Sequence, residues 1–193
     1  MKINLKYMII NIVIFSHFLL FTPLSYAKTD VTKTITTCNT CHGEKGIAVI
    51  KQYPNLAGQK KGYLFAQLKA FKSGVRDNAI MAQQLENVSE DQMQEISKYY
   101  ASLSFVKHKD KNINQAGKNI RANCISCHGM TGKTVNDTWP NLAGQNSEYL
   151  LQQLKDFSSG KRKSMIMNVI ASELNDQQMI DVAEYYQQTA SKY

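Results

Sequence analysis

The sequence predicts an all-α fold of two tandem domains that are copies of one another. Three observations support this prediction: few helix breakers, helical spacing of apolar residues, and an internal repeat. The chain has 193 residues with only 10 Gly and 3 Pro, and 43% of its residues are hydrophobic. These values are typical of a globular helical protein and argue against a fibrous or disordered one. The length allows one large domain or two small ones, and the repeat favours two.

The first 27 residues are expected to be a signal peptide. A short segment with two lysines precedes an almost purely apolar run from Met8 to Phe21. This run is short of the roughly 20 residues that a spanning helix needs. Small residues at Ser25 and Ala27 favour cleavage after Ala27, and the alternative is an uncleaved anchor. Cleavage predicts export to the periplasm, and it lowers the formal net charge of +8 by two.

The rest of the chain repeats itself without a gap when it is shifted from Cys38 to Cys124. The run Pro-Asn-Leu-Ala-Gly-Gln, for example, begins at Pro54 and again at Pro140. Self-similarity of this length indicates a duplicated domain of about 80 residues. We expect domains at 28–106 and 113–193, joined by a polar linker at 107–112.

Each copy carries the same main helix. In the first copy, large residues from Tyr63 to Phe71 follow helical spacing, with the polar Gln67 inside the apolar stripe. Gly74 is expected to end this helix. In the second copy the helix is expected to begin with Ser147 as its N-cap and to end at the equivalent glycine.

A second helix follows in each copy, and its start is marked by a capping box. The pattern is Ser89-x-x-Gln92 in the first copy and Asn175-x-x-Gln178 in the second. We also expect a short helix at 114–123, before the second cysteine pair. The equivalent stretch at 29–37 is rich in threonine and has a weaker helical pattern.

All four cysteines lie in two copies of a Cys-x-x-Cys-His motif. The residues are Cys38, Cys41 and His42 in one copy, and Cys124, Cys127 and His128 in the other. Disulfides are the default for an exported chain with an even cysteine count, but a Cys-x-x-Cys disulfide closes only a tiny ring. A zinc site would bring its cysteine pairs closer in sequence, and thioredoxin-like chemistry expects a preceding strand.

The motif is specific for covalent attachment of haem c. Two thiols at positions i and i+3 add to the two vinyl groups of one haem, and the adjacent histidine ligates the iron. Two copies in a duplicated chain therefore predict two haem c groups, one per domain. Covalent haems also stabilise small domains whose cores are thin.

The second axial ligand of each iron is predicted from the repeat. Candidate ligands are Met, His, Lys or water. The two histidines outside the motifs have no repeat partner, and His108 is expected to be a solvated linker residue. Only two methionine pairs are duplicated, and Met93 and Met179 lie on an apolar helical stripe, where core packing is expected.

The remaining pair, Met81 and Met167, is assigned to the first and second haem iron, respectively. Both are expected in the loop between the two helices, and Met165 is the alternative for the second iron. Ligation by His and Met fills both axial positions and raises the reduction potential. This arrangement suits electron transfer and argues against an enzyme that activates a substrate at the iron.

These motifs resemble the class I dihaem cytochromes c, specifically the cytochrome c4 group, from Cys38 to the C-terminus. The resemblance implies that Pro54 and Pro140, each twelve residues after a motif histidine, offer their carbonyls to the imidazole N–H. It also implies haems that face each other near the domain interface, with their propionates inside. The candidate propionate partners are Tyr53, Arg76, Trp139 and Arg162.

The sequence thus predicts a monomeric periplasmic electron carrier. By resemblance, its donor would be a membrane quinol–cytochrome c reductase and its acceptor a terminal oxidase, with weak peripheral membrane association. One alternative is the cytochrome subunit of a periplasmic dehydrogenase, such as flavocytochrome sulfide dehydrogenase. Another is a haem enzyme acting on a small sulfur compound, which needs an open axial position. Nucleic-acid binding is not supported, because the basic run 161–163 lacks nearby aromatics and suits a solvated loop or docking patch.

Overall fold

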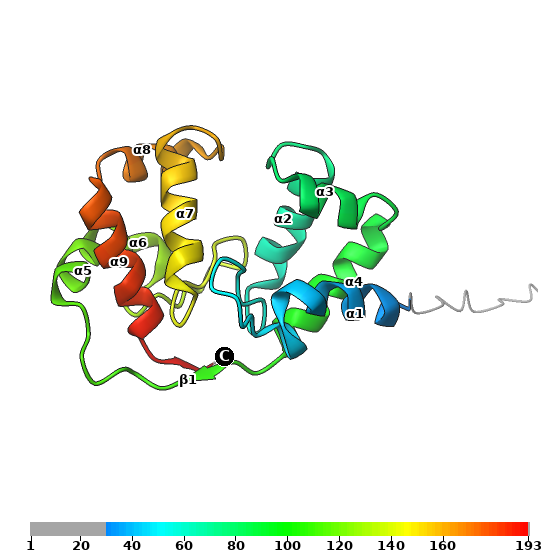
Figure 1. Cartoon of the computed structure of the whole chain (residues 1–193), viewed down its shortest axis with the longest axis horizontal. Coiled ribbons are helices and arrows are strands. Elements are labelled where there is room, and N and C mark those ends of the chain that lie inside the picture. The colour runs from blue at the N-terminus through cyan, green and yellow to red at the C-terminus, as the bar shows by residue number, and fades with distance from the viewer. Residues whose placement is uncertain (1–29, 193) are drawn as a thin grey trace, which may run out of the picture.

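The computed structural model describes residues 30–192 as two similar helical units placed side by side (Figure 1). The predicted all-α architecture with two tandem units is confirmed, because helices dominate this part of the chain. The predicted signal peptide at 1–27 lies outside the described residues. Within 30–192, no helix has the length and apolar character needed to cross a membrane.

The first unit contains four α-helices. In chain order they are α1 (Thr32–His42), α2 (Lys61–Lys72), α3 (Ala79–Leu85) and α4 (Glu90–Ser102), with a short 3-10 turn, η1 (Glu44–Gly46), after α1. The predicted capping box at the start of α4 is confirmed. The Ser89 hydroxyl accepts from the backbone N–H of Gln92 at 3.2 Å, and the Gln92 side chain accepts from the N–H of Ser89 at 2.8 Å.

The second unit follows a similar order, with three short elements in the place of α1. These are α5 (Gln115–Ile120), η2 (Arg121–Asn123) and α6 (Ile125–His128), and they are followed by α7 (Ser147–Ser158), α8 (Met165–Ser172) and α9 (Asp176–Gln188). The Asn175 and Gln178 capping box of α9 is confirmed. The N-cap expected at Ser147 is wrong by one residue, since Asn146 holds that position. The Asn146 side chain does not cap the helix, because it donates to the carbonyl of Tyr53 in the first unit at 2.8 Å.

A two-residue strand pair ties the connecting segment to the C-terminal end of the chain. β1 (Val106–Lys107) runs antiparallel to β2 (Ser191–Lys192). Further along, the N–H of Asp110 donates to the carbonyl of Gln188 at 3.0 Å. The connection between the units is therefore held along α9 and does not hang free (Figure 1).

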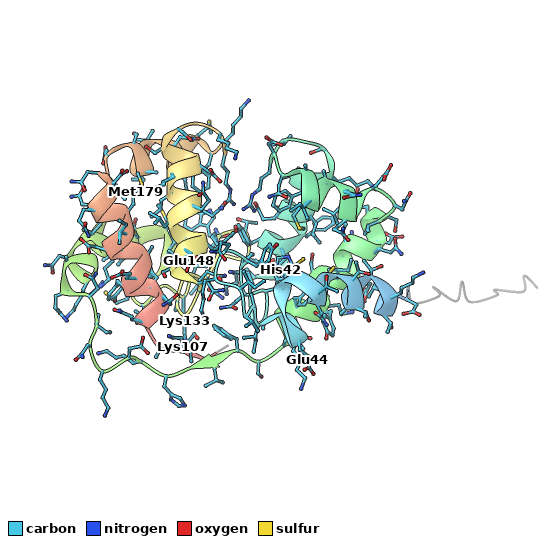
Figure 2. All side chains as sticks on the ribbon, viewed as in Figure 1. His42, Glu44, Lys107, Lys133, Glu148 and Met179 are labelled. Carbon is cyan, nitrogen blue, oxygen red and sulfur yellow. The ribbon has the colours of Figure 1, made fainter. Side chains whose placement is uncertain are left out.

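Each unit has its own apolar core. The first is built around Leu64, Leu85, Val88, Met93, Ile96 and Tyr100, and the second around Leu150, Val182, Ala183, Tyr185 and Tyr186. Met93 and Met179 are each only 3% exposed, so the prediction that this pair serves packing is confirmed; Figure 2 shows Met179 on α9. Cys38 and Cys124, the first cysteine of each motif, are partly buried and pack against these cores.

The units differ in how their N-terminal helices pack. α5 crosses α9 closely at Gly117, where an added Cβ would lie 2.0 Å from the carbonyl oxygen of Asp181. The equivalent position in the first unit is Val31, which directly precedes α1. A β-branched residue cannot allow this approach, so α1 reaches the core through Val31 and Ile35 without a comparable crossing of α4.

The repeated Pro-Asn-Leu-Ala-Gly-Gln runs meet at the interface between the units. The Gln145 side chain accepts from the backbone N–H of Asn55 at 2.7 Å and donates to the Asn55 carbonyl at 2.9 Å. Gln59 pairs with Asn141 in the same way, at 2.7 and 3.0 Å. All four residues are buried. Each glutamine thus pairs with the other unit's backbone as a neighbouring strand would.

The Asn side chains complete this symmetric network. Asn55 donates to the carbonyl of Gly144 at 3.2 Å, and Asn141 donates to the carbonyl of Gly58 at 3.2 Å. Their carbonyl oxygens accept backbone N–H groups within their own units. Because buried amides are stable only when they are hydrogen-bonded, these contacts fix the relative position of the two units.

Candidate functional site

A cavity of about 1190 Å³ lies between the helices of both units and extends across their interface. It is lined by apolar residues of both cores together with every predicted haem-binding residue. Those residues are Cys38, Cys41, His42, Met81, Cys124, Cys127, His128 and Met167. Figure 2 shows His42 in the central region of the molecule, on the side of its unit that faces the other. The duplicated motifs therefore open into one shared space.

The four cysteines present free thiols to this cavity. Cys38 and Cys41 are three residues apart on α1, and Cys124 and Cys127 hold the same spacing at α6. Residues at i and i+3 lie on one face of a helix, so each pair is directed to one side. Burial raises the pKa of Cys38 and of Cys124, which keeps them as neutral thiols.

Each motif histidine is hydrogen-bonded to the carbonyl of the proline that the resemblance implies as its partner. The distance from His42 Nδ1 to the carbonyl oxygen of Pro54 is 3.1 Å, and that from His128 Nδ1 to the carbonyl oxygen of Pro140 is 2.9 Å. A carbonyl can only accept, so Nδ1 carries the proton and Nε2 keeps its lone pair. Burial lowers the pKa of both imidazoles, although the proline hydrogen bonds oppose this. Both rings are therefore neutral and suited to bind a metal.

Met81 and Met167 are not in loops, and this expectation is wrong. Met81 is the third residue of α3, and Met167 is the third residue of α8. Their helices form because Asn78 accepts from the N–H of Met81 at 2.9 Å and Ser164 accepts from that of Met167 at 3.3 Å. These N-caps start a helix in a segment too short for a periodic pattern to reveal.

The environment of Met167 differs from that of Met165. Met167 is partly buried and lines the cavity, whereas Met165 is 93% exposed and lies outside the cavity lining. The other exposed methionine of this unit, Met130, contacts Arg121 through its sulfur. Of Met165 and Met167, only Met167 is placed to reach a group in the cavity.

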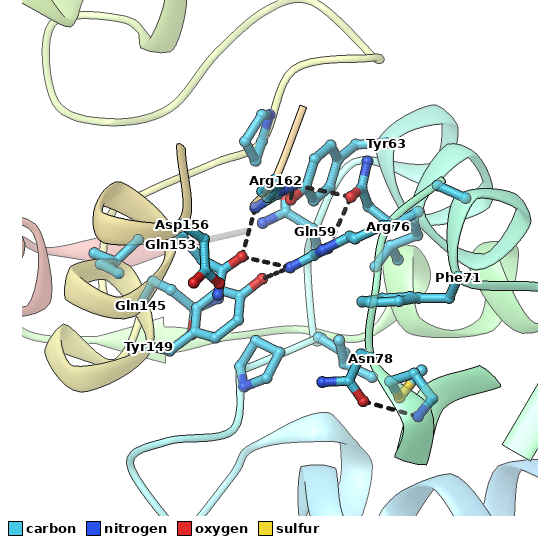
Figure 3. A pocket seen from close by; sticks show the side chains of 18 of the residues that line it. Gln59, Tyr63, Phe71, Arg76, Asn78, Gln145, Tyr149, Gln153, Asp156 and Arg162 are labelled. Carbon is cyan, nitrogen blue, oxygen red and sulfur yellow. Dashed lines mark hydrogen bonds between the residues drawn. The ribbon is translucent and has the colours of Figure 1, made fainter. Parts of the chain in front are cut away.

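Two arginines cross between the units inside the cavity (Figure 3). Arg76 donates to Tyr149 at 3.0 Å and to Gln153 at 2.6 Å, both in the second unit. Arg162 donates to Tyr63 at 3.0 Å and to Gln67 at 2.8 Å, both in the first. Each guanidinium also bonds the glutamine of its own unit, Arg76 to Gln67 at 2.7 Å and Arg162 to Gln153 at 2.8 Å.

The partners of these guanidinium groups are neutral. Among residues 30–192, the ion pairs join other residues, and neither Arg76 nor Arg162 forms one, although the charge of the Asp156 carboxylate in the same cavity acts on Arg162. Burial alone would raise the pKa of the Tyr63 phenol, but the charges of Arg162 and Arg76 lower it below its ordinary value. A positively charged cluster with neutral partners is suited to anionic groups of a ligand in the same cavity.

Sequence reasoning named Arg76 and Arg162 as candidates but did not predict their hydrogen bonds across the interface. Gln67 and Gln153 were visible as polar residues inside an apolar helical stripe, repeated at matching positions. A buried amide repeated in this way is a signal of a hydrogen-bonded partner. Its partner could not be identified, because Arg76 and Arg162 each reach into the opposite unit.

The donor set fits two covalently attached haems. Paired thiols, a neutral imidazole and a thioether occur in each half of the cavity, and two guanidinium groups lie between the halves. Within the described part of the chain, no group of three or more His, Cys, Asp or Glu residues is arranged to hold a bare metal ion.

The family model for cytochrome c matches residues 31–104 and again residues 115–190. The thiosulfate dehydrogenase electron acceptor of Stutzerimonas stutzeri is 30% identical over 172 residues, covering 80% of each chain. Cytochrome c4 of Pseudomonas aeruginosa is 30% identical over 165 residues, which is 78% of this chain and 82% of the relative.

Solved structures show the same similarity. Reduced recombinant cytochrome c4 from Pseudomonas stutzeri superimposes with a TM-score of 0.76 at 27% identity, covering 81% of this chain and 95% of the other. Thiosulfate dehydrogenase from Marichromatium purpuratum gives a TM-score of 0.71 at 26% identity. It matches 79% of this chain but only 36% of the larger protein.

Proposed function

Because the chain belongs to the cytochrome c family and carries two haem c groups, we propose that it shuttles electrons from a membrane quinol–cytochrome c reductase to a terminal oxidase. The single observation that carries this proposal is the duplicated site, in which both Cys-x-x-Cys-His motifs and a methionine from each unit line one cavity. When bound, each haem c iron can accept and release one electron.

The protein's own residues set the properties of each iron site. The carbonyls of Pro54 and Pro140 orient the imidazoles and leave Nε2 as the ligating nitrogen. We assign Met81 and Met167 as the second axial ligands, because they line the cavity at matching positions. If His and Met of the chain hold each iron, they would leave no ligand position for a substrate, and the protein would act as a carrier.

Arg76 and Arg162 are assigned to the haem propionates. Each is hydrogen-bonded across the interface by neutral side chains, so its positive charge is available to a carboxylate. The other candidate partners, Tyr53 and Trp139, also line the cavity. Charge-assisted hydrogen bonds of this kind are about twice as strong as neutral ones, and they would link both cofactors to both units.

The proposal places the protein in the periplasm after removal of residues 1–27. We expect a monomer with weak peripheral attachment to the membrane that holds its donor and acceptor. The apolar run before Ala27 and the redox partners supplied by the resemblance support this location.

A second candidate is the electron acceptor of a dehydrogenase that oxidises a small sulfur compound. The sequence alone suggests flavocytochrome sulfide dehydrogenase as one example of such an enzyme. The comparisons support a thiosulfate version, because relatives from Stutzerimonas stutzeri and Thiomonas intermedia carry the name thiosulfate dehydrogenase electron acceptor. In this case the chain would still act as a carrier, with an enzyme as its donor.

The two candidates are separated by the donor that reduces the oxidised protein. The experiment follows haem absorbance after mixing with membranes that contain a quinol–cytochrome c reductase plus quinol, or with purified thiosulfate dehydrogenase plus thiosulfate. The proposal predicts rapid reduction by the membranes and slow reduction by the dehydrogenase. The opposite order would establish the second candidate in its place. Reduction by thiosulfate without any dehydrogenase would contradict both and indicate an enzyme.

A further inference from the structure

The two units have the same fold around α3 and α8, but the residues on this surface differ. α3 and α8 lie at the same end of the molecule, opposite the connecting segment that contains β1 (Figure 1). The loop before each helix and the helix itself occupy equivalent positions in the repeat. The first unit has Val75, Asp77, Ala79 and Gln83 where the second has Lys161, Lys163, Met165 and Val169.

In the second unit two of these substitutions, Met165 and Val169, enlarge an exposed apolar surface. Ile166 is shared, because its counterpart Ile80 is also 55% exposed, and the first unit exposes Val75 where the second has Lys161. Met165 is 93% exposed, Ile166 is 55% exposed and Val169 is 57% exposed. All three lie on α8, and the exposed Lys161 and Lys163 precede it. We call these five residues the α8 patch. Adjacent exposed apolar side chains with a charged rim mark a protein interaction site.

The α8 patch borders the opening of the cavity. Lys161, Lys163 and Ile166 are exposed and also line the cavity, as does Met167. A partner covering the patch would therefore lie beside the second site. Short distance to the redox group is what a docking surface for electron transfer requires.

The charge of this surface selects the partner. The segment 160–173 exposes two basic residues, Lys161 and Lys163, and one acid, Glu173, at the far end of α8, while its third basic residue, Arg162, lies in the cavity. The matching segment 74–87 contains one basic residue and two acids, Asp77 and Glu86. An acidic partner would be attracted to the second unit and not to the first.

We propose that the α8 patch docks an acidic electron-transfer protein, so that electrons are exchanged with that partner through the second unit. Lys161 and Lys163 steer the encounter, and Met165, Ile166 and Val169 form its apolar centre. This inference rests on the proposed carrier function. It adds which unit exchanges electrons with the partner and the charge that the partner carries.

The test uses plastocyanin, a copper protein with an acidic surface, as the probe. Stopped-flow absorbance follows the fully reduced holoprotein as one electron reduces one Cu(II) of plastocyanin to Cu(I). The patch variant combines Lys161→Val with Lys163→Asp, the first unit's residues at these positions. At low ionic strength we expect its second-order rate constant to fall about tenfold, and the loss to shrink as salt screens the charges.

A matched control separates the patch from net charge. Lys118→Val with Lys98→Asp makes the same change in charge at exposed positions on α5 and α4, and we expect less than a twofold fall. A second variant, Met165→Ala with Val169→Gln, should also slow the reaction, and its effect should persist at high salt. Equal losses in patch and control variants, or no loss in the patch variants, would overturn the proposal.

A small uncharged oxidant, benzoquinone, distinguishes this failure from failure of the carrier function. If the wild-type protein cannot be reduced and then reoxidised by benzoquinone, the carrier function is wrong and the docking inference is wrong with it. If redox cycling is normal and only the plastocyanin result fails, the docking inference alone is wrong.

Discussion

Tyr100 and Tyr186 occupy matching positions in the two units, but their hydroxyl groups have different surroundings. The Tyr100 hydroxyl donates to Asn39 at 2.9 Å. At the position equivalent to Asn39 the second unit has Ile125, and the buried Tyr186 hydroxyl has no hydrogen-bond partner. The weakly polar sulfur of Cys124 lies near it. Burial raises the pKa of both phenols, so both remain protonated.

This difference predicts unequal effects of the same substitution. Tyr100→Phe removes a hydrogen bond and should lower the free energy of unfolding by about 1 kcal/mol. Tyr186→Phe removes a hydroxyl that is already unpaired, and it should be neutral or slightly stabilising. Denaturant unfolding of the two holoprotein variants measures this. Equal losses would show that the Tyr186 hydroxyl is in fact hydrogen-bonded.

The methionine assignment is also tested at single residues. Met81→Ala and Met167→Ala should each remove about half of the long-wavelength absorption band that marks Met ligation of ferric haem, and each should lower one reduction potential, because the thioether favours Fe(II). Met165→Ala is the matched control and should leave both the band and the potentials unchanged. Loss of the band in Met165→Ala, with Met167→Ala intact, would assign Met165 as the ligand.

At the scale of elements, the interface depends on two glutamines that pair with the backbone of the opposite unit. Gln145→Ala would leave the N–H and carbonyl of Asn55 unpaired in a buried place. Each such group costs about 1–3 kcal/mol. We expect Gln145→Ala and Gln59→Ala to lower the melting temperature by similar amounts and to let the two units unfold in separate calorimetric transitions.

An exposed contact across the same interface serves as the control. Gln52 donates to Glu148 at the surface, and exposed polar pairs contribute little to stability. Gln52→Ala should therefore keep the wild-type transition. If it destabilises the protein as much as Gln145→Ala does, the buried amides are not what holds the units together.

Local signals in the sequence were enough to predict the long helices. The capping box that starts at Ser89 and its copy at Asn175 mark α4 and α9 correctly, because both capping partners lie within one helical turn. α3 and α8 were missed, since a single N-cap such as Asn78 gives no periodic pattern. The partner of the N–H groups at the start of α2 could not be predicted locally, because it lies in the second unit. Asp137 accepts from the N–H of Gly62 at 2.8 Å.

The functional site likewise has residues that local patterns predict and contacts that they do not. The cysteines and histidines follow from motif spacing, and the methionines from the repeat. The cross-interface contacts of Arg76 and Arg162 depend on how the two units meet, which no local pattern contains. Duplication could reveal that these residues matter in pairs, but only the packed structure shows that each arginine serves the opposite unit.

On the scale of the whole molecule, the duplication is nearly symmetric inside and asymmetric outside. In the buried network, Asn55 and Gln59 make the same contacts with the second unit that Asn141 and Gln145 make with the first. The surfaces of α3 and α8 differ in charge and apolar exposure. The two sites line one interior cavity, while the surfaces beside them are unlike.

The positive residues behind the formal net charge of +8 lie in several parts of the chain. Two of the positive charges lie in the predicted signal peptide, and two, Arg76 and Arg162, lie in the cavity. Lys161 and Lys163 lie on the surface at the cavity opening. The distribution of charge, more than its total, decides what this protein can bind.

The central claim is that each Cys-x-x-Cys-His motif holds one covalent haem. The most direct test is the intact mass of the holoprotein after denaturation, which removes any group that is not covalently bound. We predict the mass of the chain from Lys28 onward plus two haems, falling by one haem when Cys38 and Cys41, or Cys124 and Cys127, are both replaced by alanine. A wild-type mass with one haem or none would contradict the claim.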